Sequence, residues 1–197
     1  MLKRNPIILI HGLWNTAEIF SFITTKLDEI GIEYFAPTLK HEFGRTSIVE
    51  LTNLLNDLIL EKYGYEQELD ILGFSMGGII GRYWITKLNG YKRTRRFITV
   101  GSPHKGTLTS QMVPKYPFRG ISEMKINSHF LRDLSKSDYL FNGINCISFF
   151  TYWDLMVFPG WRATLNSGEK ISLKIFKHKN LVRNPEAIRR IIERILR

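Results

Sequence analysis

A serine flanked by glycines lies in the segment GFSMGG, which spans residues 73–78. The pattern G-x-S-x-G is typical of a nucleophile elbow, a sharp turn that exposes a reactive serine oxygen. The apolar run before Ser75, over 68–74, favours a strand, and the pattern over 76–88 favours a helix. We therefore expect a strand–turn–helix unit, whose helix N-terminus directs N–H groups and positive potential toward the serine.

A serine nucleophile requires a general base, and that base requires an orienting acid. The chain has five histidines, of which only His104, His129 and His178 follow Ser75. His178 comes directly after the last expected strand, over 170–176, so it should lie at the same sheet edge as the serine. His104 also follows a strand, but only His178 leaves room for a strand-end acid before it. We expect His178 to be the base, with His104 as the next candidate.

The acid is expected between the serine and the histidine, because the fold class that carries the nucleophile elbow orders these residues serine, acid, histidine along the chain. Asp154 follows an apolar run that is predicted to be a strand. Asp133 and Asp138 fall in an irregular stretch and follow no strand. We therefore expect Asp154 to hold the imidazole tautomer of His178.

Acyl chemistry also requires hydrogen-bond donors for the negative charge that develops on the substrate oxygen. The backbone N–H of Met76, the residue after the serine, is one expected donor. The other is the N–H of Leu13, in the loop after the first strand, where Gly12 permits a close approach of the backbone. His11 precedes this loop, and we expect it to brace the loop and to take no direct part in catalysis.

The elements that must position these residues alternate between strands and helices. This alternation predicts an α/β fold in one domain over 1–197, with a mostly parallel sheet of about six strands and helices on both faces. The stretch 107–140 is irregular, apart from a short helix expected over 128–135. The predicted strands are 6–11, 32–37, 68–74, 96–102, 144–150 and 170–176, and the predicted helices are 15–30, 47–62, 76–88 and the segment that follows the Asn184 cap.

Cysteine content and hydropathy indicate the cellular compartment in which the protein is expected to reside. The 197 residues include one cysteine, Cys146, so no intramolecular disulfide forms and a reducing environment is expected. The apolar run IILI near the N-terminus is too short for the core of a signal peptide, and no run approaches the length of a membrane span. We therefore expect a cytoplasmic protein.

The formal net charge of +10 is unevenly distributed, with −3 over residues 1–90 and +13 over residues 91–197. No zinc-ligand spacing or nucleic-acid-binding motif accompanies this charge, so no nucleic-acid partner is expected. In the last predicted helix, isoleucines share one face and arginines lie largely elsewhere, which is typical of a helix packed on a sheet. The surplus charge predicts at most a weak association with anionic membrane surfaces.

Five segments resemble successive motifs of the small lipases and esterases of the α/β-hydrolase superfamily, the triacylglycerol lipase-like group: PIILIHGLWN, GFSMGG, GSPHKGT, DLMVFP and HKNLVRNP. The resemblance implies a triad of Ser75, Asp154 and His178, an oxyanion hole at Leu13 and Met76, and no metal or cofactor. Larger members have two further strands before the first motif and a larger cap than 107–140 can form. A minimal core with a shallow site is therefore implied.

Apolar residues flank these motifs and are expected to form the substrate wall, chiefly Trp14, Met156, Phe158 and Leu181. Together these features predict a serine hydrolase that cleaves carboxylic esters, with lipid acyl esters as the expected substrates. The same residues would support acyl transfer or thioester hydrolysis. A binding module that has lost turnover is a further alternative, against which the intact set of serine, acid and histidine argues.

Overall fold

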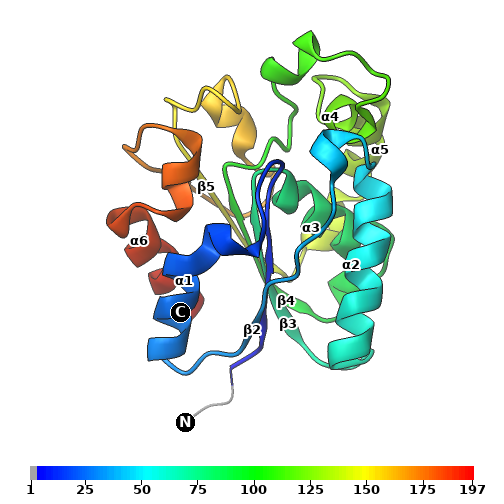
Figure 1. Ribbon diagram of the computed structural model, residues 1–197. Coiled ribbons are helices and arrows are strands. Elements are labelled where there is room, and N and C mark those ends of the chain that lie inside the picture. The colour runs from blue at the N-terminus through cyan, green and yellow to red at the C-terminus, as the bar shows by residue number, and fades with distance from the viewer. Residues whose placement is uncertain (1–3) are drawn as a thin grey trace.

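The computed structural model describes residues 4–197, which form a parallel six-stranded sheet between two layers of helices (Figure 1). The strand order is β2-β1-β3-β4-β5-β6, and every pair of neighbours is parallel. This arrangement confirms the predicted α/β fold with a parallel sheet of about six strands. The strands are β1 (Ile7–Ile10), β2 (Tyr34–Phe35), β3 (Leu69–Phe74), β4 (Thr94–Val100), β5 (Asn145–Phe150) and β6 (Glu169–Ser172).

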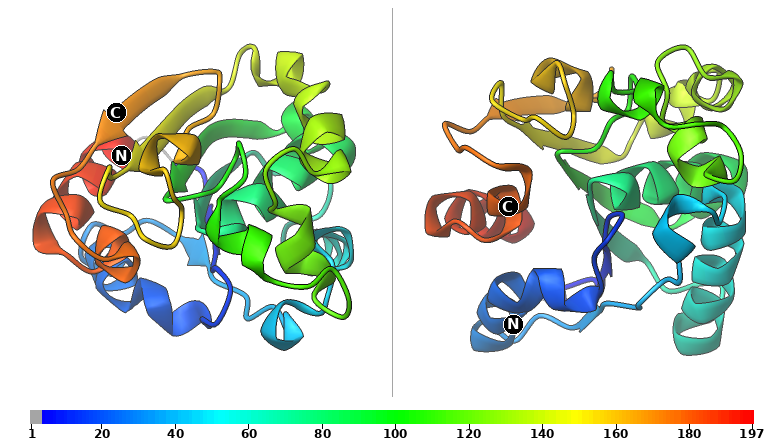
Figure 2. Two further views of the ribbon diagram at one scale, coloured as in Figure 1. Left: turned by 90° about the horizontal axis from the view of Figure 1, so that it is seen from above. Right: turned by 45° about the horizontal axis from the view of Figure 1, so that its top comes forward.

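Helices cover both faces of the sheet. Helices α1 (Ser21–Glu29) and α6 (Pro185–Leu196) pack together on one face, while α2 (Ile48–Tyr63) and α3 (Met76–Lys87) cover the other (Figures 1 and 2). Two short helices, α4 (Arg119–Glu123) and α5 (His129–Ser135), pack on α2 and α3 respectively. Within residues 4–197, no helix has the length and apolar character needed to cross a membrane.

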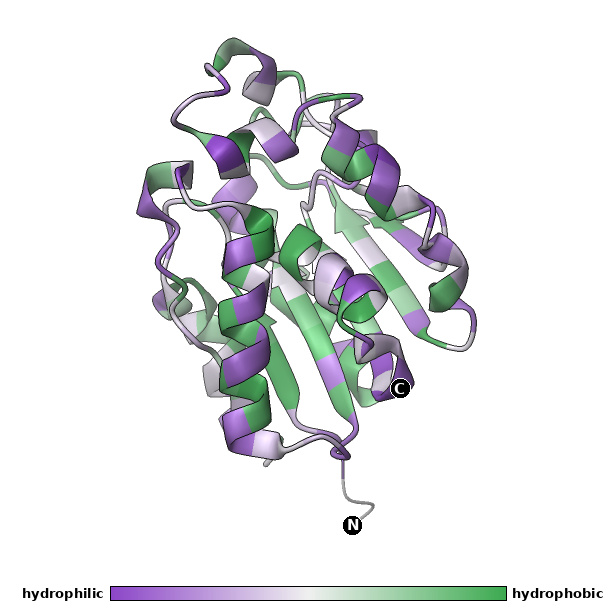
Figure 3. Ribbon diagram, turned by 90° about the vertical axis from the view of Figure 1, so that its right-hand side faces the viewer, coloured by the Kyte–Doolittle hydropathy of each residue, from purple (hydrophilic) through white to green (hydrophobic). Residues whose placement is uncertain are grey.

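The first strand illustrates why uniformly apolar runs form this sheet. Side chains alternate between the two faces of a strand, and both faces are covered here. Ile7 and Leu9 join the core beneath α1 and α6, whereas Ile8 and Ile10 join the core beneath α2 and α3. Figure 3 shows mostly hydrophobic strands behind helices that alternate between hydrophilic and hydrophobic residues.

Side-chain caps set the starts of the helices at the predicted places. Ser47 and Glu50 form a capping box at the N-terminus of α2, in which each side chain accepts a hydrogen bond from the other residue's backbone N–H. Asn184 caps α6 by accepting a hydrogen bond from the N–H of Glu186, and Pro185 occupies the first helical position.

The structure adds a short helix, α4, in the stretch 107–140 that was expected to be irregular outside 128–135, and it places β4 two residues earlier than predicted. Three further predicted elements are shorter or interrupted in the structure. Strand β2, at one edge of the sheet, is only two residues long and pairs with β1 alone. Strand β6 ends at Ser172, although Leu173 and Ile175 still point into the core. The expected helix over 15–30 begins with a separate 3₁₀ turn, Ala17–Phe20, before α1.

Candidate active site

Ser75 occupies a strained turn at the carboxyl end of β3. Its backbone angles, φ 55° and ψ −127°, lie outside the regions that L-residues ordinarily adopt. The flanking glycines are required by space: a Cβ on Gly73 would lie 2.4 Å from the Cα of Gly78, and a Cβ on Gly77 would lie 1.9 Å from the carbonyl oxygen of Ile10. The turn therefore has the geometry that the G-x-S-x-G pattern predicts.

Asp154 and His178 form a buried hydrogen-bonded pair. The His178 Nδ1 lies 2.7 Å from Asp154 Oδ2, and both side chains are more than nine-tenths buried. The other carboxylate oxygen, Oδ1, accepts hydrogen bonds from the N–H groups of Met156 at 2.9 Å and Val157 at 3.0 Å. These bonds fix the carboxylate, which in turn fixes the orientation of the imidazole ring.

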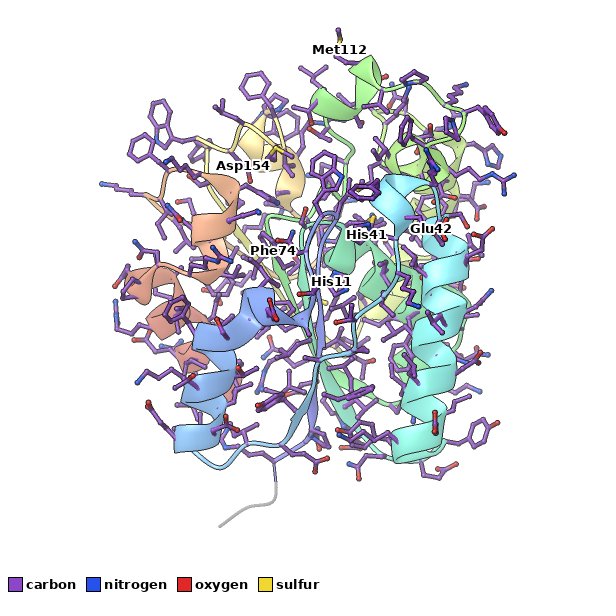
Figure 4. All side chains as sticks on the ribbon, viewed as in Figure 1. His11, His41, Glu42, Phe74, Met112 and Asp154 are labelled. Carbon is purple, nitrogen blue, oxygen red and sulfur yellow. The ribbon has the colours of Figure 1, made fainter. Side chains whose placement is uncertain are left out.

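The imidazole of His178 lies at the same sheet edge as the serine. Its ring packs on the ring of Phe74, the residue before the serine, with 4.8 Å between the centroids. The His178 ring also lies against Gly101, where an added Cβ would be 2.9 Å from the Cε1 of His178. The preceding residue, Val100, accepts a hydrogen bond at its carbonyl from the N–H of Ser75. Figure 4 shows Asp154 above Phe74 at this end of the sheet.

The second ring nitrogen of His178, Nε2, is buried and has no hydrogen-bond partner among residues 4–197. His178 Nε2 and Ser75 Oγ are therefore not hydrogen-bonded to each other in this structure. Such contacts often tighten only when substrate is bound. The arrangement leaves one imidazole nitrogen oriented by a carboxylate and the other open to accept a proton.

The loop after β1 lies against the serine from the opposite side. A Cβ on Gly12 would lie 2.6 Å from the Cβ of Ser75 and 3.2 Å from its Oγ. Leu13 follows in the same loop. Met76 is the first residue of α3, so its N–H has no acceptor within that helix. The expected oxyanion donors, Leu13 and Met76, therefore belong to the two segments that flank the serine.

Two histidines hold this loop in place. Burial lowers the pKa of His11, which favours the neutral ring. Its Nδ1 lies 2.9 Å from the carbonyl oxygen of Gly12, and its Nε2 accepts a hydrogen bond from the N–H of Leu39 at 2.8 Å. His41 Nε2 accepts from the N–H of Trp14 at 3.1 Å (Figure 4). No role was expected for His41, because it lies in no recognisable sequence motif.

The residues expected to form the substrate wall divide into two groups. Trp14, Met156 and Phe158 are half exposed in loops at the carboxyl edge of the sheet. Leu181 is fully buried in the core beneath α1 and α6, so its expected contact with substrate is wrong. It sits in a 3₁₀ turn, His178–Val182, which directs its side chain inward beside Gly101.

Two features of the loops around the site were not foreseen. Trp153 and Phe176 are both exposed and stack at 5.7 Å between ring centroids. Thr109 Oγ1 donates a hydrogen bond to the Met156 carbonyl at 2.6 Å, which fastens the loop after Asp154 to the segment after β4. Neither contact has a signal in the sequence, because each joins loops that are distant along the chain.

A sequence model of the palmitoyl protein thioesterase family matches residues 6–153, which is most of the chain. The protein belongs to the palmitoyl protein thioesterase family. The matched region contains the proposed nucleophile and ends one residue before Asp154. Membership of this family confirms the prediction of an enzyme of the carboxylic ester hydrolase class. The search of curated proteins found no match to this sequence.

Solved structures show the same fold at low sequence identity. Aspergillus fumigatus lipase B has a TM-score of 0.79 at 15% identity, over 98% of this chain and 53% of the lipase. The mature lipase BlEst2 of Bacillus licheniformis has a TM-score of 0.74 at 13% identity, over 99% and 93% of the two chains. A pyrethroid hydrolase from Sphingobium faniae has a TM-score of 0.62 at 16% identity, with 97% of each chain covered. This family member therefore has the α/β-hydrolase fold, as the motif resemblance implied, and spans about half the length of the first of these lipases.

Proposed function

We propose that the protein hydrolyses acyl esters by nucleophilic catalysis, with Ser75 as nucleophile, His178 as general base and Asp154 as the orienting acid. The observation that carries this proposal is the 2.7 Å bond between His178 Nδ1 and Asp154 Oδ2 at the sheet edge where Ser75 occupies its strained turn. A neutral imidazole whose Nδ1–H is held by a carboxylate presents its Nε2 lone pair to a hydroxyl proton.

In the first half of the reaction, Ser75 Oγ attacks the substrate carbonyl and its proton passes to His178 Nε2. The carboxylate of Asp154 stabilises the imidazolium, and the N–H groups of Leu13 and Met76 stabilise the oxyanion. The imidazolium then protonates the leaving alkoxide or thiolate as the acyl-enzyme forms.

In the second half, His178 takes a proton from water as that water attacks the acyl-enzyme. The tetrahedral intermediate releases the carboxylic acid, and Ser75 Oγ regains its proton from the imidazolium. The cycle therefore needs only side chains and backbone groups of this chain together with one water molecule.

We assign the acyl group to the lipid class because exposed apolar side chains gather in the loops around the triad. Trp153, Leu155 and Phe176 are each at least 60% exposed. Together with Trp14 and Met156 they offer the apolar contact area that a long acyl chain requires. The family description favours a thioester as a second candidate substrate, and the same triad would cleave it.

A fluorophosphonate probe tests the nucleophile directly. We expect stoichiometric labelling on Ser75 in the intact protein and none in a Ser75→Ala variant. Equal labelling of both proteins would contradict the assignment of the nucleophile.

Substrate pairs that differ in only one group, either the acyl chain or the leaving group, then separate the candidate reactions. The kcat/KM values for palmitoyl and butyryl p-nitrophenyl esters report the preference for chain length, and a palmitoyl thioester reports the preference for the leaving group. A lipid acyl preference requires a higher kcat/KM for the palmitoyl ester. Addition of a small alcohol reveals acyl transfer as an ester product in place of the free acid.

A further inference from the structure

An open cavity of about 360 Å³ lies between α5, the loop after β4 and the segment that follows Pro159. None of the three proposed triad residues lines it. Its basic lining residues are Arg82, Lys105, Arg132 and Arg162, accompanied by polar groups of Asn127, Ser135, Thr164 and Asn166. The cavity is therefore distinct from the proposed active site.

The charges in this cavity are unbalanced. Arg82 is buried and forms an ion pair with Asp138 at 2.6 Å. Within residues 4–197, the other three cations, Lys105, Arg132 and Arg162, form no ion pair with a carboxylate. Burial and the neighbouring cations lower the pKa of Lys105. Lys105 and Arg162 are partly buried, whereas Arg132 is exposed. Like charges held together beside partly buried cations are unfavourable unless an anion offsets them.

A buried histidine adds a second, independent feature. His104 lines the cavity, is only 4% exposed, and has no hydrogen-bond partner at either ring nitrogen among residues 4–197. Burial lowers the pKa of His104 well below its usual range, so the ring is neutral and carries one N–H donor. Both ring nitrogens are shielded from the open space of the cavity, so a ligand oxygen completes the hydrogen bonding of this donor when the cavity wall moves to admit it.

The Arg162 side chain is held in position to contact such a ligand. Its guanidinium donates hydrogen bonds to the carbonyl oxygens of Lys105 and Gly106, which hold the side chain at the cavity wall. Lys105 Nζ lies 3.4 Å from Thr164 Oγ1 on the same wall. Arginine and lysine side chains fixed beside hydroxyl and amide groups suit the tetrahedral oxygens of a phosphate.

From the charge imbalance and the unpartnered histidine together, we infer that this cavity binds a phosphate monoester, with Lys105, Arg132 and Arg162 as the cationic contacts and His104 as a neutral donor. The inference does not depend on the proposed ester hydrolysis, because the two sites share no side chain. The ligand is either a free phosphorylated small molecule or the phosphate of a lipid headgroup.

Titration calorimetry with inorganic phosphate tests the site, with sodium chloride used to match the ionic strength. We expect saturable binding of one phosphate per chain and a higher unfolding temperature. The double variant Lys105→Gln/Arg132→Gln should bind at least tenfold more weakly. A charge-matched control, Lys40→Gln/Arg45→Gln, removes two exposed cations outside the cavity and should bind as the unsubstituted protein does. Equal affinity in the double variant, or no binding at all, would overturn the inference.

Nitrogen-15 spectra of the histidine side chains provide a readout that does not depend on any substitution. Phosphate should shift the ring nitrogen signals of His104 and leave those of His129, which is exposed outside the cavity, unchanged. An unmoved His104 signal at saturating phosphate would contradict its role as donor. Competition by glycerol 3-phosphate identifies a soluble ligand, whereas tighter retention on phosphatidic acid vesicles that is lost in the double variant identifies the headgroup.

Discussion

The loop after β1 touches the proposed nucleophile: a Cβ atom on Gly12 would lie 2.6 Å from the Cβ of Ser75. Real Cβ atoms do not approach so closely, so the Gly12→Ala substitution must push the loop away from the serine. Leu13 would move with it, and its N–H would lose its proposed position at the oxyanion.

We therefore expect Gly12→Ala to lower kcat on p-nitrophenyl butyrate by about 10²–10³-fold, the cost of removing one oxyanion donor. Fluorophosphonate labelling and the unfolding temperature, measured on the same preparation, distinguish a displaced loop from an unfolded protein. A folded variant that keeps a third or more of the original kcat would show that the Leu13 N–H does not serve the reaction.

The hydrogen bond between His178 and Asp154 predicts the effect on kcat of replacing the carboxylate with an amide. In Asp154→Asn the amide oxygen can still accept from the N–H groups of Met156 and Val157, so the amide NH₂ would face His178 Nδ1. That contact selects the imidazole tautomer with a proton on Nε2, which cannot act as base. We expect kcat to fall about 10⁴-fold, as in a related triad.

A matched pair of histidine variants tests the base. His178→Gln should abolish turnover, with a loss on the order of 10⁶-fold, whereas His104→Gln should retain it because His104 lies in the separate cavity. The measurement is kcat on the same ester for both variants. Loss of activity in His104→Gln with retention in His178→Gln would move the base to the loop after β4.

Glu123 makes stability depend on pH. Burial raises the pKa of its carboxyl to about 7 from 4.5, although the carboxylate accepts a hydrogen bond from the N–H of Ile48. The folded protein thus binds this proton more tightly than the unfolded chain does. Its contribution to stability is complete below pH 4.5 and is lost as the pH rises through 7.

The substitution Glu123→Gln, which mimics the protonated acid, should therefore raise the unfolding temperature at pH 8 more than at pH 5. Glu61→Gln on the exposed side of α2 is the control. Its change in unfolding temperature relative to the unsubstituted protein should be the same at pH 5 and pH 8. Calorimetric unfolding at both pH values provides the comparison. A Glu123→Gln difference that is the same at pH 5 and pH 8 would contradict the raised pKa.

The uneven charge predicts weak, salt-sensitive binding to anionic vesicles. On α6 the positive charge of Arg189 is offset by ion pairs with Glu186 and Glu193. We therefore expect the strongest contacts with anionic lipid to come from the exposed lysines near the Trp153–Phe176 stack, at positions 174, 177 and 179. Each nearby cation contributes about 1 kcal/mol at an anionic surface. Screening should remove most of the binding near 0.5 M salt, where the Debye length is about 4 Å.

Vesicle co-sedimentation measures this association. A triple lysine-to-glutamine variant at 174, 177 and 179 should pellet less than the unsubstituted protein, and the charge-matched change of Lys40, Arg45 and Lys92 to glutamine should pellet equally. Equal pelleting with neutral and anionic vesicles would leave the charge without a role in membrane association.

Much of the fold could be predicted because its central strands are covered on both faces. Leu69 to Phe74 are all buried, so the strand appears in the sequence as an apolar run, and the turn after it requires glycines that are equally visible. The order of Ser75, Asp154 and His178 along the chain then restricts which side chains can meet at one sheet edge.

Other features depend on tertiary contacts that a single sequence does not contain. Leu173 and Ile175 alternate as strand residues do, but their burial reflects core packing after β6 has ended. Leu181 follows a motif residue, yet the 3₁₀ turn directs it inward. The partners of His41 and Arg82 lie 27 and 56 positions away, at Trp14 and Asp138, with no local pattern to mark them.

The pairing of α1 with α6 has a consequence for the order in which activity appears during synthesis. The Ser75 turn and the proposed oxyanion loop have been synthesised once the first half of the 197 residues has been made, but His178 follows about a hundred residues later. The α1 face of the sheet stays uncovered until α6 follows. A ribosome-bound chain would therefore carry Ser75 without its proposed base, and we expect ester hydrolysis to begin only after α6 has emerged and docked.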